Sequence, residues 1–141
     1  MTTLERDLAD IRHLIAEAER HQSDPARFIP LHTPDISVVN FAGRHVQGRT
    51  TLAAAMTQAL ASPLAAVPTR TEIETIRLVS TDAAIVSCLK HVSDQREPAL
   101  RDGPDTRLPA TTGQLTYVVV RHPDPASGWL ITSAQTTPVL T

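Results

Sequence analysis

Residues 114–137, QLTYVVVRHPDPASGWLITSAQTT, contain two runs that are rich in β-branched and aromatic residues. This is the composition of β-strands, and the runs predict strands at about 114–121 and 129–137. Two earlier runs of the same kind cover approximately residues 69–80 and 83–93. The second half of the chain is therefore predicted to form a β-meander.

The first half of the chain is predicted to be mainly helical. In residues 2–22 apolar side chains recur every three or four positions, which indicates an amphipathic helix, and Thr2 and Glu5 have the spacing of a capping box. A short helix, a strand at residues 35–42 and a helix at residues 50–61 should follow. Helices first and strands later favour the α+β class, with helices packed on one face of a curved antiparallel sheet.

Length and charge favour one cytoplasmic domain that covers residues 1–141. The chain has 13 basic and 15 acidic residues and a net charge of −2, which disfavours binding to nucleic acid or to an anionic membrane. The N-terminus lacks the basic start and apolar stretch of a secretory signal. The single cysteine, Cys88, lies in an apolar run and is expected to be a buried thiol.

Residues 94–113, DQREPALRDGPDTRLPATTG, interrupt the meander with a polar stretch that is rich in proline and glycine. It is longer than an ordinary hairpin turn. Two interpretations remain open, a mobile flap beside the mouth of a pocket and an inert loop. In either case we expect it to be the least ordered internal segment.

Three blocks of sequence, in this order, resemble the SgcJ/EcaC branch of the SnoaL-like members of the NTF2-like superfamily, and the resemblance covers essentially the whole chain. The first block is VVNFAGRHVQGR, residues 38–49; the second is the run at 114–121; the third is GWLITSAQTTPV, residues 128–139. Their most specific residues are Asn40, Gly43, Gly48, Arg49, Leu115, Thr116, Val118, Arg121, Trp129, Ile131, Thr137 and Pro138.

The resemblance implies a cone of curved sheet, of the cystatin-like α+β barrel type, whose N-terminal helices cover an internal pocket for a small, largely apolar molecule. It also implies a role in natural-product biosynthesis, for example of polyketides or enediynes, and frequent dimerisation through the outer face of the sheet. A homodimer is expected here, because Val118 and Val120 alternate with Tyr117 and Val119 and make both faces of that strand apolar.

Several side chains are candidates for the wall of this pocket. Simple alternation would place Trp129, Ile131, Ser133, Gln135 and Thr137 on one face of the last strand. A large ring together with hydroxyl and amide groups suits a ligand pocket. The alternative is that Trp129 belongs to the core and Gln135 bonds to backbone. The predicted ligand-binding residues are Asn40, His91, Tyr117, Trp129, Gln135 and Thr137.

Two of these residues are amides where related proteins carry acid or base groups. Asn40 takes the place of the aspartate base of the superfamily's ketosteroid isomerases, and Gln135 takes the place of a histidine. An amide does not exchange protons near neutral pH. The remaining candidates for catalysis are His91, Asp35 and Tyr117. The histidines are scattered along the sequence, so no metal site is expected. The sequence has no glycine-rich phosphate loop, so no nucleotide cofactor is expected either.

Three functions follow from these observations. The first is an auxiliary, non-catalytic small-molecule binder in a biosynthetic pathway. The second is a cofactor-independent cyclase, isomerase or dehydratase that acts on a polyketide-like substrate. The third is a dimeric assembly or docking module.

Overall fold

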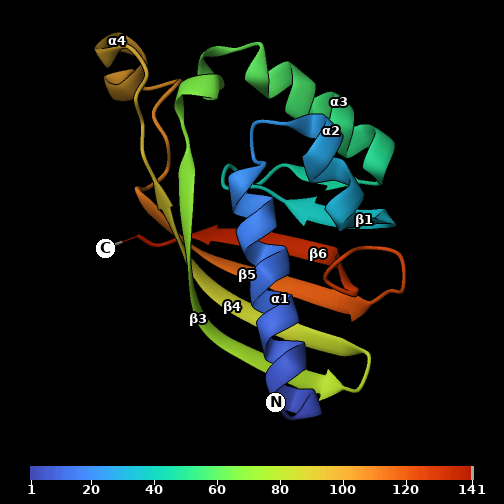
Figure 1. The fold of residues 1–141 in the computed structure, drawn as a ribbon. Coiled ribbons are helices and arrows are strands. Elements are labelled where there is room, and N and C mark those ends of the chain that lie inside the picture. Colours follow the sequence, from blue (N-terminus) through green and yellow to red (C-terminus); the bar gives the residue numbers. More distant parts are fainter. Residues whose placement is uncertain (141) are drawn as a thin grey trace.

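A computed structural model describes residues 1–140 as helices followed by a meander, as the sequence predicts (Figure 1). The first half contains α1 (Thr3–Arg20), α2 (Pro25–Phe28), a 3₁₀ turn (Ile29–Leu31), β1 (His32–Val39), β2 (His45–Gln47), α3 (Arg49–Leu60) and a second 3₁₀ turn (Pro63–Ala66). The second half contains β3 (Thr69–Ser80), β4 (Ala83–Val92), α4 (Pro98–Asp102), β5 (Thr112–Arg121) and β6 (Trp129–Pro138). Within the described residues no helix is long and apolar enough to cross a membrane.

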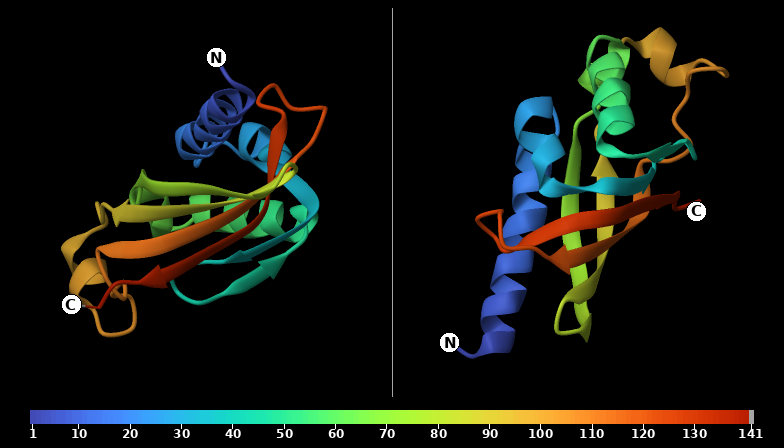
Figure 2. Two further views of the ribbon diagram at one scale, coloured as in Figure 1. Left: turned by 90° about the horizontal axis from the view of Figure 1, so that it is seen from below. Right: turned by 90° about the vertical axis from the view of Figure 1, so that its right-hand side faces the viewer.

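All six strands form one curved, open sheet in the order β2-β1-β6-β5-β4-β3. Neighbouring strands are antiparallel except β1 and β6, which run parallel. The sheet is antiparallel, as expected, at every neighbouring pair except this one. Parallel neighbours need a long connection between them, and residues 40–128 provide it. Figure 2 shows the curvature of the sheet and α1 lying against it.

Helix α1 covers the inner face of the sheet with its apolar side. The Thr2 hydroxyl caps the helix by accepting a hydrogen bond from the Glu5 amide at 3.1 Å. The buried apolar residues of α1 are Ile11, Leu14, Ile15 and Ala18, and they pack in one core with Ala84, Val86 and Cys88 of β4 and with Leu115 and Val119 of β5. These strand residues define the inner face, and their alternate neighbours define the outer face.

Strand β6 contains one extra residue relative to β5. Ile131 pairs with Val119, but Ser133 pairs with Val118, so Thr132 is a β-bulge. The Thr33 hydroxyl donates a hydrogen bond to the Thr132 hydroxyl at 3.0 Å. A bulge inverts the alternation of the residues that follow it. The predicted common face from Trp129 to Thr137 is therefore wrong after Ile131: Ala134 and Thr136 face inward, and Ser133, Gln135 and Thr137 face outward.

The free edge of β3 is covered by polar side chains from the end of α1. Gln22 accepts hydrogen bonds from the Thr69 amide and hydroxyl and donates one to the Thr69 carbonyl. Glu19 accepts a hydrogen bond from the Thr71 amide. These contacts satisfy backbone groups that an edge strand otherwise leaves open, and they hold α1 at the wide end of the cone.

Candidate functional site

The wide end of the cone contains a cavity of about 210 Å³ that we call the mouth cavity. Its lining comes from the loop after β1, the second 3₁₀ turn and the residue that follows it, the first residue of β3, the last three residues of β4, and the segment before β5. The lining residues are Asn40, Phe41, Ala42, Leu64, Val67, Thr69, Lys90, Val92 and Leu108. Most of these side chains are apolar, and Lys90 is the only ionisable group among them.

Lys90 lies on the inner face of β4, two residues beyond the fully buried Cys88. It pairs with Gly113 of β5 on one side and with Thr71 of β3 on the other. Burial lowers the pKa of the Lys90 ammonium, because a low-dielectric surrounding disfavours the charged form. Among residues 1–140 no carboxylate lies within 4.0 Å of the ammonium, and no side chain or backbone group forms a hydrogen bond with it.

Asn40 positions the aromatic wall of the mouth cavity through a turn. Its Oδ1 atom accepts hydrogen bonds from the backbone amides of Ala42 at 3.0 Å and Arg44 at 2.9 Å. The Phe41 ring at this turn lies over Gly113, where an added Cβ would be only 2.9 Å from Phe41 Cε2. Glycine at residue 113 therefore makes room for the ring. Asn40 lines the mouth cavity, but its side-chain oxygen already accepts the hydrogen bonds of the turn.

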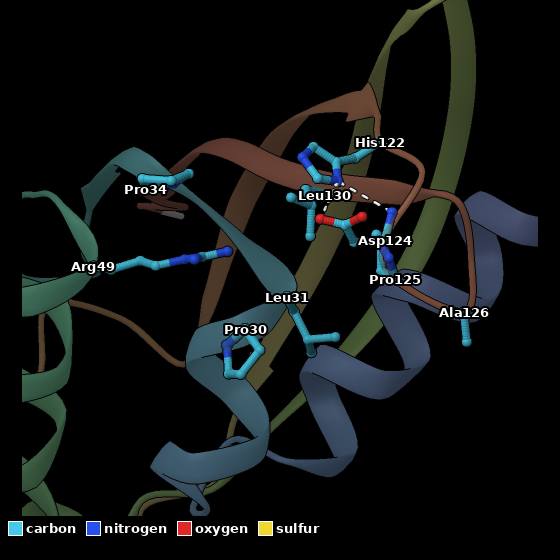
Figure 3. Close-up of a pocket in the computed structure, with 9 residues that line it drawn as sticks. All are labelled: Pro30, Leu31, Pro34, Arg49, His122, Asp124, Pro125, Ala126 and Leu130. Atoms are coloured by element: carbon cyan, nitrogen blue, oxygen red, sulfur yellow. Dashed lines mark hydrogen bonds and ion pairs between the residues drawn. The ribbon is translucent and has the colours of Figure 1, made fainter.

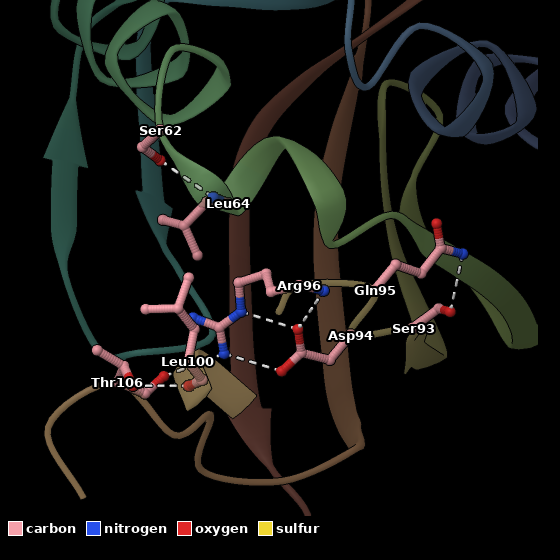
Figure 4. Close-up of polar contacts among 8 residues, drawn as sticks. All are labelled: Ser62, Leu64, Ser93, Asp94, Gln95, Arg96, Leu100 and Thr106. Atoms are coloured by element: carbon pink, nitrogen blue, oxygen red, sulfur yellow. Dashed lines mark hydrogen bonds and ion pairs between the residues drawn. The ribbon is translucent and has the colours of Figure 1, made fainter. Parts of the chain in front are cut away.

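The polar segment between β4 and β5 crosses the mouth of the cone and includes α4. Arg96 is buried and forms two hydrogen bonds of 2.8 Å with the Asp94 carboxylate and one of 3.0 Å with the Thr106 carbonyl (Figure 4). The hydrogen bonds from Arg96 hold the pKa of Asp94 below its usual value. Leu108 from the same segment lines the mouth cavity. These contacts place the segment beside the mouth cavity, which is the position that the flap interpretation requires.

Trp129 lies at the opposite, narrow end of the cone and is completely buried. The guanidinium of Arg121 lies 4.5 Å above its ring, and the same guanidinium forms hydrogen bonds of 3.1 and 3.0 Å with Asp7 of α1. Tyr117 faces inward between the two ends and packs on the core, and burial raises its pKa. Trp129 and Tyr117 are thus interior residues, but neither lines the mouth cavity.

The other predicted site residues lie away from the interior of the cone. His91 is on the outer face, where its Nε2 is 3.1 Å from the Glu72 carboxylate. Gln135 and Thr137 are exposed on the same face, as a consequence of the bulge. Asp35 is exposed in β1. The structure therefore brings Asn40 to the cavity and separates these four residues from it.

His32 and Cys88 are buried, and both are held in uncharged forms. The Nδ1 atom of His32 donates a hydrogen bond of 2.9 Å to the Phe28 carbonyl, yet burial lowers the pKa of His32 to about 4. Burial, together with the charge of Glu74, raises the pKa of the Cys88 thiol to about 12. Within residues 1–140 no group of three or more histidine, cysteine or acidic side chains could hold a metal ion.

A larger groove of about 550 Å³ lies between the start of β1, Arg49 and the β5–β6 loop (Figure 3). Its polar groups already have partners. Arg49 donates hydrogen bonds to the His32 carbonyl, one of them from Nε at 2.7 Å. The partner of Arg49 is thus a backbone oxygen. The Nδ1 atom of His122 lies 3.7 Å from the carboxylate of Asp124. The mouth cavity remains the better candidate because its cation has no partner.

Lys90 is the residue that sequence reasoning missed. The signal was present in the run AAIVSCLKHV, where simple alternation places Lys90 on the same face as Cys88, which was expected to be buried. His91 was predicted instead, because histidine is the side chain whose ordinary pKa lies near neutral pH. Alternation places the two neighbours on opposite faces, so only one of them could line the pocket.

The chain has the NTF2-like, cystatin-like fold, as solved structures show. A cystatin-like domain of unknown function from Nostoc punctiforme is 21% identical, with a TM-score of 0.75 over 100% of this chain and 81% of that one. A candidate dehydratase of the NTF2-like family from Streptomyces avermitilis is 18% identical, with a TM-score of 0.70 over 97% and 99%. A candidate scytalone dehydratase from Novosphingobium aromaticivorans is 14% identical, with a TM-score of 0.71 over 98% and 89%. No protein-family model matches the sequence, and no curated protein matches it significantly.

Proposed function

We propose that this protein binds a small, largely apolar organic molecule in the mouth cavity without transforming it by acid–base chemistry. The observation that supports this most strongly is the lining: Phe41, Leu64, Val67, Val92 and Leu108 surround a space that no protein side chain fills. Apolar walls supply affinity, and a few polar groups fix orientation. The expected acid–base candidates, His91 and Asp35, lie outside this space, which favours binding over catalysis.

The size of the cavity limits its occupant. About 210 Å³ is below the range of roughly 300–1,000 Å³ that is typical of sites for drug-sized ligands. An adjoining cavity of about 350 Å³, lined by Arg44, Val46 and Gln58 among others, shares Asn40 and Leu64 with it. A compact ligand fits the mouth cavity alone, and a longer one would extend into this second space.

The biological setting that we propose is natural-product biosynthesis, with the protein as an auxiliary factor. This part rests on the resemblance to SnoaL-like proteins of polyketide and enediyne pathways. The candidate dehydratases that share the fold are compatible with this setting, although at 14% and 18% identity they support the fold alone.

A homodimer is part of the proposal. The outer face of the central strands carries Ile85, Leu89, Val118 and Val120, all of them only partly buried in the single chain. Contact with a second copy would remove this apolar surface from water. Sedimentation at micromolar concentration should give one species near twice the chain mass of 15.3 kDa, and Val118→Lys should shift it toward the monomer.

Binding can be tested with neutral apolar probes such as hexanol and benzyl alcohol, using ligand-observed NMR and calorimetry. Val67→Trp should abolish binding by filling the cavity. Val79→Trp is the matched control, because Val79 is exposed at the far end of β3 and lines no part of the cavity. Equal binding by both variants, or no binding by the wild type, would refute the proposal.

A further inference from the structure

Lys90 places a positive charge in the mouth cavity without a counter-ion from the protein. Three carboxylates lie on neighbouring parts of α1 and β3, and each contacts another group. Glu19 accepts a hydrogen bond from the amide of Thr71, which pairs with Lys90. Glu72 contacts His91 on the outer face, and Glu74 accepts a hydrogen bond of 2.7 Å from the Gln114 amide. No other ionisable side chain lines the cavity. The three N–H donors of the ammonium therefore open onto space that a ligand can occupy.

The adjoining cavity is also lined by a positively charged side chain. Arg44 lines it, and the two cavities share Asn40 and Leu64. None of the residues that line either cavity is acidic. The low dielectric of an apolar cavity strengthens the attraction between Lys90 and an anion, and an anion offsets the cost of burying the ammonium.

We propose that the ligand of the mouth cavity is a small organic carboxylate, whose anionic group pairs with Lys90 and whose apolar body lies against Phe41, Val67 and Leu108. This inference rests on the proposed function and specifies its ligand class. The lining agrees with it, because Lys90 is the one ionisable side chain in the lining and most of the other lining residues are apolar. Phe41 comes from the loop after β1, Val67 follows the second 3₁₀ turn, and Leu108 comes from the segment before β5.

The test compares acids with amides of the same shape. The probes are 3-phenylpropionate with 3-phenylpropanamide, and hexanoate with hexanamide, measured by calorimetry at fixed pH and salt. In the wild type each acid should bind about 10- to 100-fold more tightly than its amide, the range expected for a hydrogen bond to a charged group in a partly buried site. Lys90→Met should reduce this preference to about one, and Lys90→Arg should retain part of it.

Arg70→Met is the matched control for net charge. Arg70 is exposed on the outer face, opposite His91 in the strand register, and its loss should leave the acid preference unchanged. Equal affinities for acid and amide in the wild type would overturn the inference and leave the proposed function standing, as would an unchanged preference in Lys90→Met. If neither member of either pair binds, the cavity itself is refuted as a binding site. The wild-type comparison needs no variant, so a folding defect cannot obscure it.

Discussion

Replacing Asn40 by alanine should destabilise the protein by a predictable amount. The side chain accepts two backbone hydrogen bonds, from the amides of Ala42 and Arg44, in an exposed turn. Each such bond contributes about 0.5–1.5 kcal/mol net, and water can solvate the released amides, so we expect a loss of about 1–2 kcal/mol. With an unfolding entropy of about 2.1 cal/mol/K per residue over 141 residues, Tm should fall by roughly 3–7 °C.

Two matched variants test whether the loss of stability comes from the hydrogen bonds of this turn and not from the removal of an amide side chain as such. Asn40→Asp keeps the acceptor oxygen and should stay within about 0.5 kcal/mol of the wild type. Gln135→Ala removes an exposed amide from the outer face and should also have little effect. Urea unfolding with calorimetry measures all three variants. The reasoning is refuted if Asn40→Ala is as stable as the wild type, or if Asn40→Asp loses as much stability as Asn40→Ala.

Three further predictions concern buried or polar groups. The pKa of His32 falls from 6.5 to about 4 on folding, so between these pH values the unfolded chain binds more protons than the folded one. The free energy of unfolding should therefore drop by about 3 kcal/mol as pH falls from 6.5 to 4. Urea titrations measure this drop, and His32→Gln should remove it. Cys88 is fully buried and the pKa of its thiol is raised to about 12. The rate at which a disulfide reagent modifies the thiol of the native protein should therefore equal the rate at which the protein opens. Rapid modification without unfolding would contradict this placement. Within the polar segment 94–113, the residues that precede β5, 94–111, should exchange amide hydrogens faster than β4 and β5. Arg96→Met should increase the difference by removing the contacts with Asp94 and Thr106, and exchange as slow as in the flanking strands would disprove the prediction.

Most secondary structure and the fold class could be predicted from sequence because they depend on short-range periodicity. Apolar residues at helical spacing predicted α1, and β-branched runs predicted β3 to β6 to within a few residues. The turn glycines Gly43 and Gly48 both have positive φ, which explains why the break between β1 and α3 was visible in the sequence. The short helix α4 within residues 94–113 was not predicted, since its segment has no apolar period, and the three-residue strand β2 was not predicted either.

The candidate site was predicted less well, because it depends on which face of a strand each side chain occupies. One extra residue, Thr132, is enough to send Gln135 and Thr137 to the outer face. The bulge forms through the pairing of β6 with β5 and through the hydrogen bond from the Thr33 hydroxyl to the Thr132 hydroxyl. Thr33 lies 99 positions before Thr132 in the chain. No local pattern in β6 specifies such a contact.

The sequence by itself determined the helical and strand periods, the α+β class and the burial of Cys88, since each depends on residues that are neighbours in the chain. The tertiary structure alone decided the parallel pairing of β1 with β6, the bulge, and the meeting of Lys90 with Phe41 and Leu108 around one cavity. The physical reason is that these features depend on contacts between distant segments, which exist only after the sheet has formed and its register has been selected by the packing of one face against α1.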